Sequence, residues 1–410
     1  MTPAILSLNA GSSSVKFALF SAAADGLPVE ICRGQADGLG ASPRFRAKSV
    51  SGTPLADRTL ALGARSFHEA ALGEIIAVAQ DSLDGAAVAA VGHRIVHGGS
   101  HFVDPIAIDD RVVAALADLA PLAPLHQTHN LSGVAAARQV FPAALQIACF
   151  DTAFHRTHDW VNDTYALPRH LYEEGVRRYG FHGLSYAYVA GELARIDPAA
   201  ANGRTVIAHL GNGASLCALE AGRAVATTMG FSPLDGLAMG TRTGQLDPSV
   251  VFYLARARGM TLDAIEDLVY RQSGLKGLSG LSSDMREIEA AGTLESEQAI
   301  AYFVHMIRRE LGALAAILGG LDTLVFCGGI GENGWHIRER VCQNMAWLGL
   351  KLDTRRNRQG APLVSMKSSR VAVRVIPTNE EACIAAAALR LMRAARGDTP
   401  STDLASGATP

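Results

Sequence analysis

Two stretches of this chain, about 200 residues apart, follow one plan. Residues 5–17, ILSLNAGSSSVKF, read as an apolar strand, a turn of Gly and Ser, and a second strand with alternating apolar residues. Residues 206–230, VIAHLGNGASLCALEAGRAVATTMG, repeat this plan and add a third strand after a hairpin turn at Ala221-Gly222. A unit that occurs twice predicts two domains of related fold. The aligned pairs are Leu8 with Leu210, Gly11 with Gly213, and Ser13 with Ser215.

The first turn, which carries Asn9 and residues 11–14, has two interpretations. Taken alone it is an ordinary hairpin turn. It is not a Walker loop, because Lys16 lacks the Gly-Lys-Ser/Thr spacing and a strand follows where that loop needs a helix. The second copy favours a phosphate site, since backbone N–H groups from one turn in each domain can point at phosphates between two lobes. Such a duplicated clamp resembles the superfamily of actin, the sugar kinases and Hsp70.

Composition excludes several classes of function. The chain has 410 residues, of which 49% are hydrophobic and 19% are charged, and its net charge is −2. Basic residues are not in excess, so the composition does not predict binding to nucleic acid. No apolar run approaches the ~20 residues of a membrane span. The start of the chain lacks the pattern of an export signal, and the six cysteines form no CxxC pair. These features predict a cytoplasmic protein with reduced thiols.

A third glycine cluster, TLVFCGGIGENG, lies at residues 323–334. We expect a buried strand over 323–327, and the helical spacing of WHIRERVCQNMAWLGL predicts a helix over 335–350. The cluster also fits G-x-G-x-x-G, with Asp353 about 20 residues further on, so a dinucleotide-dependent oxidoreductase is one alternative. In a two-lobed ATPase the same glycines would let the backbone approach an adenosine.

Four polar residues stand where binding or catalysis is expected. Arg94 and Arg242 are flanked by Gly, and we expect both in loops, where they favour anion binding. Asp151 follows the apolar stretch 145–150, and strand ends carry function in open α/β sheets. His182 lies between two glycines in RRYGFHGLSY.

Each of the carboxylates has a structural alternative. Asp151 could be a structural carboxylate, and Asp284 could be the N-cap of a helix. Glu380 and Glu381 begin an Ala-rich helix, so they could complement the helix dipole with Thr378 as the N-cap.

A histidine metal site is a weaker alternative. His93, His97 and His101 are spaced by four residues, but Gly98-Gly99 interrupts any helix that would carry them.

Nine ordered segments, spanning about residues 4–392, are together similar to the acetokinase family, which includes acetate, propionate and butyrate kinases. They are LNAGSSSVKF, HRIVHGG, FDTAFH, YGFHGLS, HLGNGAS, MGFSPLDGLAMGTRTGQLDPSV, SGLSSDMR, GGIGEN and TNEE. The resemblance implies an α/β, two-lobed actin-like ATPase fold with duplicated ribonuclease H-like domains. It implies a reversible, Mg²⁺-dependent phosphoryl transfer between ATP and acetate that gives acetyl phosphate and ADP. Propionate would be a further acceptor, and Mn²⁺ could replace Mg²⁺.

The resemblance also implies a division of the chain. Residues 1–150 would form the lobe that holds the carboxylate, the Mg²⁺ and the phosphate end. Residues 151–378 would form the nucleotide lobe, and a helix over 379–394 would return to the first lobe. The polar tail 395–410 is expected to be disordered. Members of the family form homodimers.

The roles of single residues follow from the same resemblance. Arg94, Asp151, His182 and Arg242 match the catalytic positions, and Arg94 also holds the substrate carboxylate. The acyl pocket matches Val96, Leu125, Phe181 and Pro233, and the metal positions match Asn9 and Glu380. Positions that contact ATP or ADP match Ser14, Lys16, His209, Leu210, Gly211, Asn212, Gly213, Asp284, Met285, Arg286, Gly329, Ile330, Gly331, Glu332 and Asn333.

The chemistry agrees with this assignment. A carboxylate is already ionised at pH 7, so the enzyme needs positive charge and positioning more than a strong base. We therefore expect Asp151 to orient metal-bound water or an arginine, although its family counterpart is often called a proton donor or acceptor. An actin-like ATPase that serves as a binding or chaperone module is a second alternative, but it would not need Arg94.

The sequence departs from the family pattern at two places, and both leave the shape of the cleft open. Gln245 stands where an acidic residue is more usual, and residues 127–129 replace an Asn-Pro-containing stretch.

Overall fold

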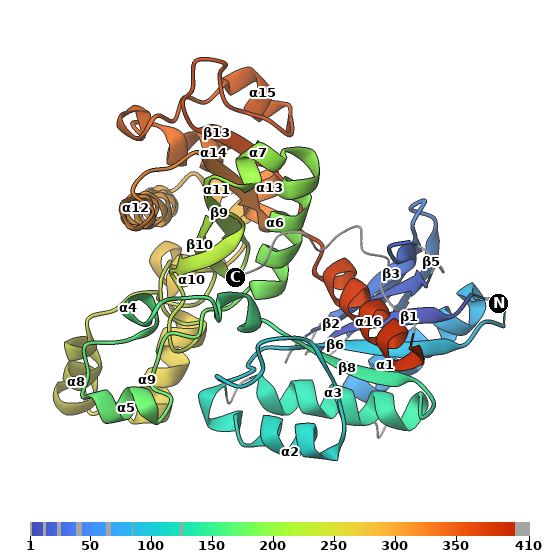
Figure 1. Cartoon of the computed structure of the whole chain (residues 1–410). Coiled ribbons are helices and arrows are strands. Elements are labelled where there is room, and N and C mark those ends of the chain that lie inside the picture. The colour runs from blue at the N-terminus through green and yellow to red at the C-terminus, as the bar shows by residue number, and fades with distance from the viewer. Residues whose placement is uncertain are drawn as a thin grey trace. The chain divides into compact units, whose positions relative to one another are not determined.

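The computed structural model describes residues 2–10, 14–22, 26–37, 43–62, 67–83, 85–123 and 126–397. The chain divides into two compact units (Figure 1). The first unit comprises Met1–Ala153 and the segment that begins at Asn379, and the second comprises Phe154–Thr378. The division falls after Ala153, so the first unit includes Asp151. Most of the tail expected to be disordered, 395–410, lies outside the described residues.

The first unit has an eight-stranded sheet in the order β5-β4-β3-β2-β1-β6-β8-β7. Strands β1, β6 and β8 are parallel, β2 is the antiparallel neighbour of β1, and β3 is the antiparallel neighbour of β2. The strands are β1 Ala4–Ala10, β2 Ser14–Ser21, β3 Val29–Asp37, β4 Arg44–Ser49, β5 Pro54–Thr59, β6 Val88–Ile95, β7 Ile106–Ala107 and β8 Leu145–Phe150.

The second unit has a five-stranded sheet in the order β11-β10-β9-β12-β13. Its strand directions match those of β3-β2-β1-β6-β8, since β9 is antiparallel to β10 and parallel to β12, which is parallel to β13. The predicted duplication is therefore confirmed in the topology of both sheets. The strands are β9 Arg204–Leu210, β10 Ala214–Glu220, β11 Arg223–Thr227, β12 Thr323–Cys327 and β13 Ala372–Val375.

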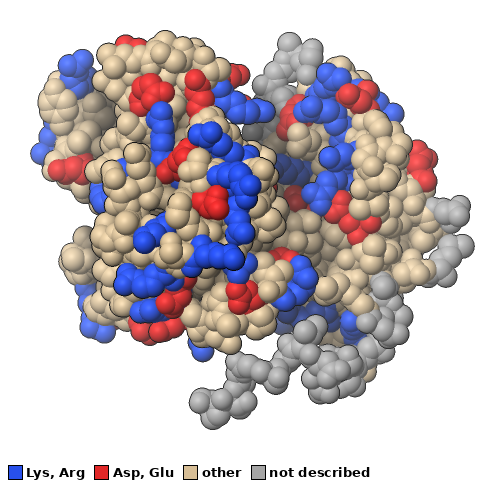
Figure 2. Space-filling model, turned by 90° about the horizontal axis from the view of Figure 1, so that it is seen from above, with Lys and Arg blue, Asp and Glu red and all other residues tan. Residues whose placement is uncertain are grey.

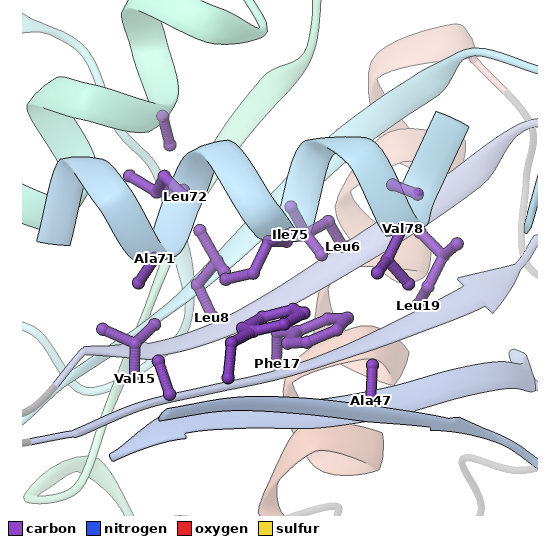
Figure 3. Packing of buried hydrophobic residues seen from close by; sticks show 14 of the residues in the cluster. Leu6, Leu8, Val15, Phe17, Leu19, Ala47, Ala71, Leu72, Ile75 and Val78 are labelled. Carbon is purple, nitrogen blue, oxygen red and sulfur yellow. The ribbon is translucent and has the colours of Figure 1, made fainter. Parts of the chain in front are cut away.

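Strand alternation in the first unit builds a core on one face of the sheet. Leu6 and Leu8 of β1 and Phe17 of β2 point to the same side, where they pack against helix α1 (Phe67–Ser82) through Ile75 and its neighbours (Figure 3). Helix α16 (Glu380–Arg396) covers the opposite face, where it packs on β1 and β6. Gly92 permits this approach, because a Cβ there would lie 2.3 Å from the Ile384 side chain.

The remaining helices surround the two sheets. The first unit also contains η1 Ala120–Leu122, α2 Asp110–Ala117 and α3 Gln127–Val140. The second unit contains η2 Ala153–His155 at its start, α4 Trp160–Asp163, α5 Arg169–Glu173, α6 Gly183–Ile196, α7 Pro198–Ala201, α8 Pro248–Ala257, α9 Leu262–Asp267, η3 Leu268–Gln272, α10 Gly274–Ser279, α11 Met285–Ala291, α12 Leu294–Ile317, α13 Gly328–Asn333, α14 Trp335–Cys342, η4 Ala346–Leu348 and α15 Thr354–Arg358.

Two local predictions are wrong. The helix expected over 335–350 ends at Cys342, because Asn344 adopts a left-handed conformation with φ of 63°. The N-cap of the Ala-rich helix is Asn379 rather than Thr378, since the Asn379 side chain accepts a hydrogen bond from the Ala382 N–H at 3.1 Å.

Charges of both signs are spread over the face that Figure 2 draws. Surface arginines such as Arg204 and Arg340 pair with Asp322 and Glu297 at 2.8 Å. Within the residues that the structure describes, no helix has the length and apolar character that crossing a membrane requires.

We predict a loss of stability in acid from the buried His93 in β6. Its Nε2–H donates to Gln146 Oε1 at 2.8 Å, and burial lowers the pKa of His93 to about 4. The unfolded chain binds this proton near pH 6.5, so the stability is complete above pH 6.5 and is lost as the pH falls toward 4. The loss at pH 5 should be about 2 kcal/mol. Urea unfolding of the wild type and of His93→Gln at pH 7 and pH 5 measures it. An equal pH dependence in both proteins would contradict the prediction.

Candidate active site

The carboxyl ends of the three parallel strands in the first unit bring Asn9, Arg94 and Asp151 together. Arg94 lies in strand β6, so the prediction that it occupies a loop is wrong. Its Nε and Nη2 donate to the two oxygens of Asp151 at 3.0 and 2.5 Å, while its Nη1 donates to Asn9 Oδ1 at 3.1 Å. Asp151 is almost completely buried, with 1% of its side chain exposed, whereas 22% of Arg94 is exposed. The ion pair therefore holds one guanidinium rigidly at the carboxyl ends of the parallel strands.

The first turn of α16 adds acidic groups to the same place. Glu380 Oε2 lies 3.8 Å from Arg94 Nε. The negative charge of Glu381 also helps to raise the pKa of Arg94. Since Asn379 already caps the helix, Glu380 is not required as its N-cap. Amide and carboxylate oxygens of Asn9, Asp151 and Glu380 thus surround one arginine.

Burial and charge act in opposite directions on this pair. Burial raises the pKa of Asp151 above its ordinary value, Arg94 opposes this effect, and Glu380 adds to it. For Arg94 burial lowers the pKa, but the carboxylates of Asp151 and Glu380 outweigh it, so the pKa of Arg94 is raised. Arg94 is a permanent cation.

In the second unit, His182 precedes helix α6 in a left-handed conformation with φ of 61°. Residues other than Gly seldom adopt this conformation, and such strain concentrates at functional sites. His182 Nδ1 lies 2.9 Å from Ser215 Oγ, and its ring stacks on that of His209 with the centroids 4.3 Å apart. His209 Nδ1 in turn lies 2.7 Å from Ser185 Oγ. The two imidazoles are therefore fixed by hydroxyl groups of α6 and β10.

Arg242 reaches the same turn from a different loop. Its Nη1 donates to the Pro233 carbonyl at 2.9 Å. A Cβ built on Gly213 would lie 3.1 Å from His182 Nε2 and 3.8 Å from Arg242 Nη1, so both side chains converge on this glycine. The Gly240 N–H donates to the Asn212 carbonyl at 3.0 Å, which ties the turn of residues 211–213 to the arginine loop. Arg242 is thus a loop residue, as predicted.

The GGIGEN segment forms α13 directly after β12. The Glu332 carboxylate accepts N–H groups of Gly328 and Thr378 at 2.9 and 3.1 Å. The buried guanidinium of Arg338 donates to the carbonyls of Gly331 and Glu332 at 2.8 Å. Gly328 has φ of 75° and packs so closely on Leu210 that a Cβ would clash. These contacts hold the segment beside the end of β9.

The segment from Asp284 to Arg286 begins a helix, with the predicted N-cap at Asp284. Asp284 is the N-cap of α11, since its Oδ1 accepts from the Arg286 N–H at 2.9 Å. The Arg286 side chain pairs with the same carboxylate and is 87% exposed. A capping role does not conflict with nucleotide contacts, which stay a prediction for these residues.

The other predicted residues fall in both units. Val96 of the first unit and Phe181 of the second are buried, and Lys16 projects from β2 with an exposed side chain. Leu125 and the turn residues 11–13 lie outside the described residues. Several residues that contact the candidate groups were not predicted as site residues. They are Asn130, which accepts from the Val96 N–H at 3.0 Å, Ser185, Tyr186 and Ser215. Only Ser215 carried a signal, as the partner of Ser13 in the repeat.

The departures from the family pattern have structural partners of their own. Gln245 is exposed and accepts a hydrogen bond from Arg309. Gln127 is buried at the start of α3 and donates to the carbonyls of His97 and Leu116 at 3.2 and 3.0 Å.

Comparison with known proteins identifies the class. The model of the Acetokinase family matches residues 4–386. An acetate kinase from Methylocella silvestris is 53% identical over 96% of this chain and 98% of its own length. The crystal structure of Porphyromonas gingivalis acetate kinase has a TM-score of 0.84 at 36% identity and covers 95% of this chain and 100% of its own. A propionate kinase from Francisella tularensis has a TM-score of 0.86 at 34% identity and covers 94% and 98%.

Two duplicated α/β units with polar loops at their strand ends define a phosphotransferase of the actin-like ATPase fold. The chain belongs to the acetokinase family, and its enzymatic function is that of an acetate kinase. The fold and family predicted from the sequence are confirmed. The oxidoreductase and chaperone alternatives are thereby excluded.

We predict that Arg94→Ala lowers stability as well as activity. Asp151 would keep its burial but lose its counter-ion, which costs about 3–5 kcal/mol. The double variant Arg94→Ala/Asp151→Asn should recover part of this stability without recovering activity, because the buried charge is gone while the guanidinium is still missing. Thermal melting and kinase assays on the three proteins measure both effects. A single variant as stable as the wild type would show that Asp151 does not depend on Arg94.

Proposed function

We propose that Arg94, Asp151 and Asn9 form the acetate and metal end of the active site, and that His182 and Arg242 act on the transferring phosphoryl group. The observation that carries this proposal is the Arg94 guanidinium, fixed by a buried carboxylate at the carboxyl ends of three parallel strands. A permanent planar cation of this kind suits a carboxylate substrate.

Asp151 would serve as a positioning residue for Arg94 rather than as a general base. Acetate is already ionised at pH 7, so phosphoryl transfer to it requires no proton removal. Both oxygens of Asp151 are occupied by Arg94, which limits their use toward other groups. In this mechanism Arg94 fixes the attacking carboxylate and lowers the repulsion between two anions.

The second unit would hold the nucleotide and the phosphoryl group. Arg242 and His182 converge on Gly213 in the turn of residues 211–213, whose backbone we expect to lie against the phosphates. Donors that are already in place stabilise the charge that spreads over the equatorial oxygens in the transition state. The α13 segment, with Gly329 to Asn333, would approach the adenosine.

The family's reaction requires a divalent metal ion, and we propose Mg²⁺ held by Asn9 and Glu380. Their hard oxygen donors fit Mg²⁺, which is normally bound through one or two carboxylates together with substrate phosphates. The same donors accept Mn²⁺. The bound ion would neutralise phosphate charge, while Asn9 keeps its hydrogen bond with Arg94.

A screen of C2 to C4 acids tests the proposed function. Purified protein with MgATP is offered acetate, propionate and butyrate, and acyl phosphate and ADP are both measured. Acetate should be preferred, propionate should react and butyrate should be poor, because one methylene changes binding by only ~1–3 kcal/mol. ADP formation that does not depend on the acid would contradict the proposal.

Glu380 allows a test of the metal site. Glu380→Ala should raise the Mg²⁺ concentration needed for half-maximal activity and lower turnover if this carboxylate holds the ion. If it only complements the helix dipole, stability should fall by roughly 0.3–1 kcal/mol and the Mg²⁺ titration should not move. Glu381→Ala in the same helical turn is the matched control, since it removes an equal charge.

Val96 allows a test of the acyl pocket. Val96→Ala removes two methyl groups, so propionate should gain relative to acetate in kcat/KM by about 10-fold. Val91→Ala, at a buried valine of strand β6, which ends one residue before Val96, is the control for lost packing. Steady-state kinetics with both acids give the ratio. An unchanged ratio in Val96→Ala would remove Val96 from the pocket.

We further propose a homodimer that forms through helix α8. None of the ten residues of α8 is buried, although Val250, Phe252 and Tyr253 are large and apolar. Leu262 of the neighbouring α9 is 73% exposed. A second copy of this chain would cover these side chains. Phe252→Asp should halve the mass measured by light scattering, whereas Val161→Asp on α4 should not. A wild type that is monomeric at micromolar concentration would contradict the proposal.

The predicted cytoplasmic location rests on the thiols. All six cysteines are present as thiols rather than disulfides in the described residues, and five of them are buried.

A further inference from the structure

Three side chains of the second unit form a buried hydroxyl chain that ends on His182. The Tyr186 hydroxyl lies 2.5 Å from Ser215 Oγ, which lies 2.9 Å from His182 Nδ1. Tyr186 and Ser215 are completely buried. Tyr186 comes from the first turns of α6 and Ser215 from β10, so two elements fix the ring that precedes α6.

The hydrogen bonds from Tyr186 through Ser215 to His182 have a preferred donor direction. A phenol is a stronger acid than an aliphatic alcohol, so Tyr186 is the better donor in its short contact with Ser215. Thr227, the other hydroxyl beside Tyr186, donates to the Leu216 carbonyl at 2.8 Å, so toward the phenol it can only accept. We assign the phenol proton to Ser215, because the Tyr186 hydroxyl makes its 2.5 Å hydrogen bond there. With its oxygen accepting from Tyr186, the Ser215 hydroxyl has its proton available for His182 Nδ1. Each bond then strengthens the next.

We propose that Tyr186 and Ser215 are positioning residues that hold His182 as the neutral tautomer with its proton on Nε2, aimed at the transferring phosphoryl group. This inference rests on the role proposed for His182. Nε2 is the ring atom that faces Gly213, where Arg242 also converges. A proton on Nε2 makes this atom a donor toward anionic oxygens, whereas the other tautomer would present a lone pair that repels them.

The surroundings of His182 favour a neutral ring. The charged or titratable groups beside it in the described residues include Arg242 in its loop, His209 stacked at 4.3 Å and Tyr186 on α6. Burial raises the pKa of Tyr186 well above its ordinary value, so the phenol keeps its proton. The cationic Arg242 disfavours a second positive charge beside it. A neutral histidine has two tautomers. A hydroxyl group that donates a hydrogen bond to Nδ1 selects the tautomer with its proton on Nε2.

The tautomer can be measured without activity. Nitrogen-15 NMR of histidine-labelled protein, with His182→Gln to assign the signal, should show the Nε2–H form in the wild type. Ser215→Ala and Tyr186→Phe remove only one oxygen each, and both should shift His182 toward a mixture of tautomers. Tyr172→Phe is the control, because it also loses one hydroxyl contact in this unit, at 3.1 Å from Asp163.

The same variants have an expected kinetic effect. Ser215→Ala and Tyr186→Phe should lower kcat about 10- to 100-fold and leave the KM values for ATP and acetate nearly unchanged, since the ring loses its orientation but not its place. Tyr172→Phe should behave like the wild type. An Nδ1–H signal in the wild type, or variants with an unchanged tautomer, would overturn the proposal. If His182→Gln itself keeps full activity, the role proposed for His182 fails, whatever the tautomer shows.

Discussion

The buried ion pair of Arg94 and Asp151 sets the requirements for the first unit. A carboxylate with 1% exposure needs a partner that neutralises it and occupies both oxygens, and a guanidinium in strand β6 provides this geometry. The pairing requires β6 and β8 to be adjacent and parallel, so that both residues lie at one edge of the sheet. It also leaves Nη1 for Asn9 at the end of β1. These hydrogen bonds can therefore form together only when β1, β6 and β8 lie side by side and run in the same direction.

The second unit reaches a related arrangement with different chemistry. Its sheet has the same strand order and directions, but the turn after β9 carries glycines, and the side chains beside it are histidines and an arginine. Duplication thus supplied two similar strand ends, which then diverged. The first carries a fixed cation among oxygen donors, and the second carries a histidine and an arginine that converge on the glycine turn. A reaction between two anions uses both kinds of environment.

Much of the fold could be predicted because its signals are local. The repeated strand–turn–strand unit, the strand over 323–327 and the helix that starts at Glu380 are short patterns of apolar spacing and turn residues. Arg94 was misjudged for the same reason, because flanking glycines suggested a loop. Gly92 is instead required within the strand, where Ile384 of α16 packs against it. A contact nearly 300 residues away in sequence leaves no local signal.

The contacts that orient the candidate groups were the least predictable part of the site. Ser215, Tyr186 and Ser185 are ordinary residues of a strand and a helix. The pairing of β9 with β10 places Ser215 opposite His209, and the packing of α6 on β9 brings Ser185 to His209 and Tyr186 to Ser215. Hydroxyl groups carry no charge, and of these three only Ser215 belongs to a sequence pattern, yet in our proposal they decide which nitrogen of His182 bears the proton. Residues that act on substrate are recognisable by their type. Residues that act through another side chain are recognisable only by their distance to it.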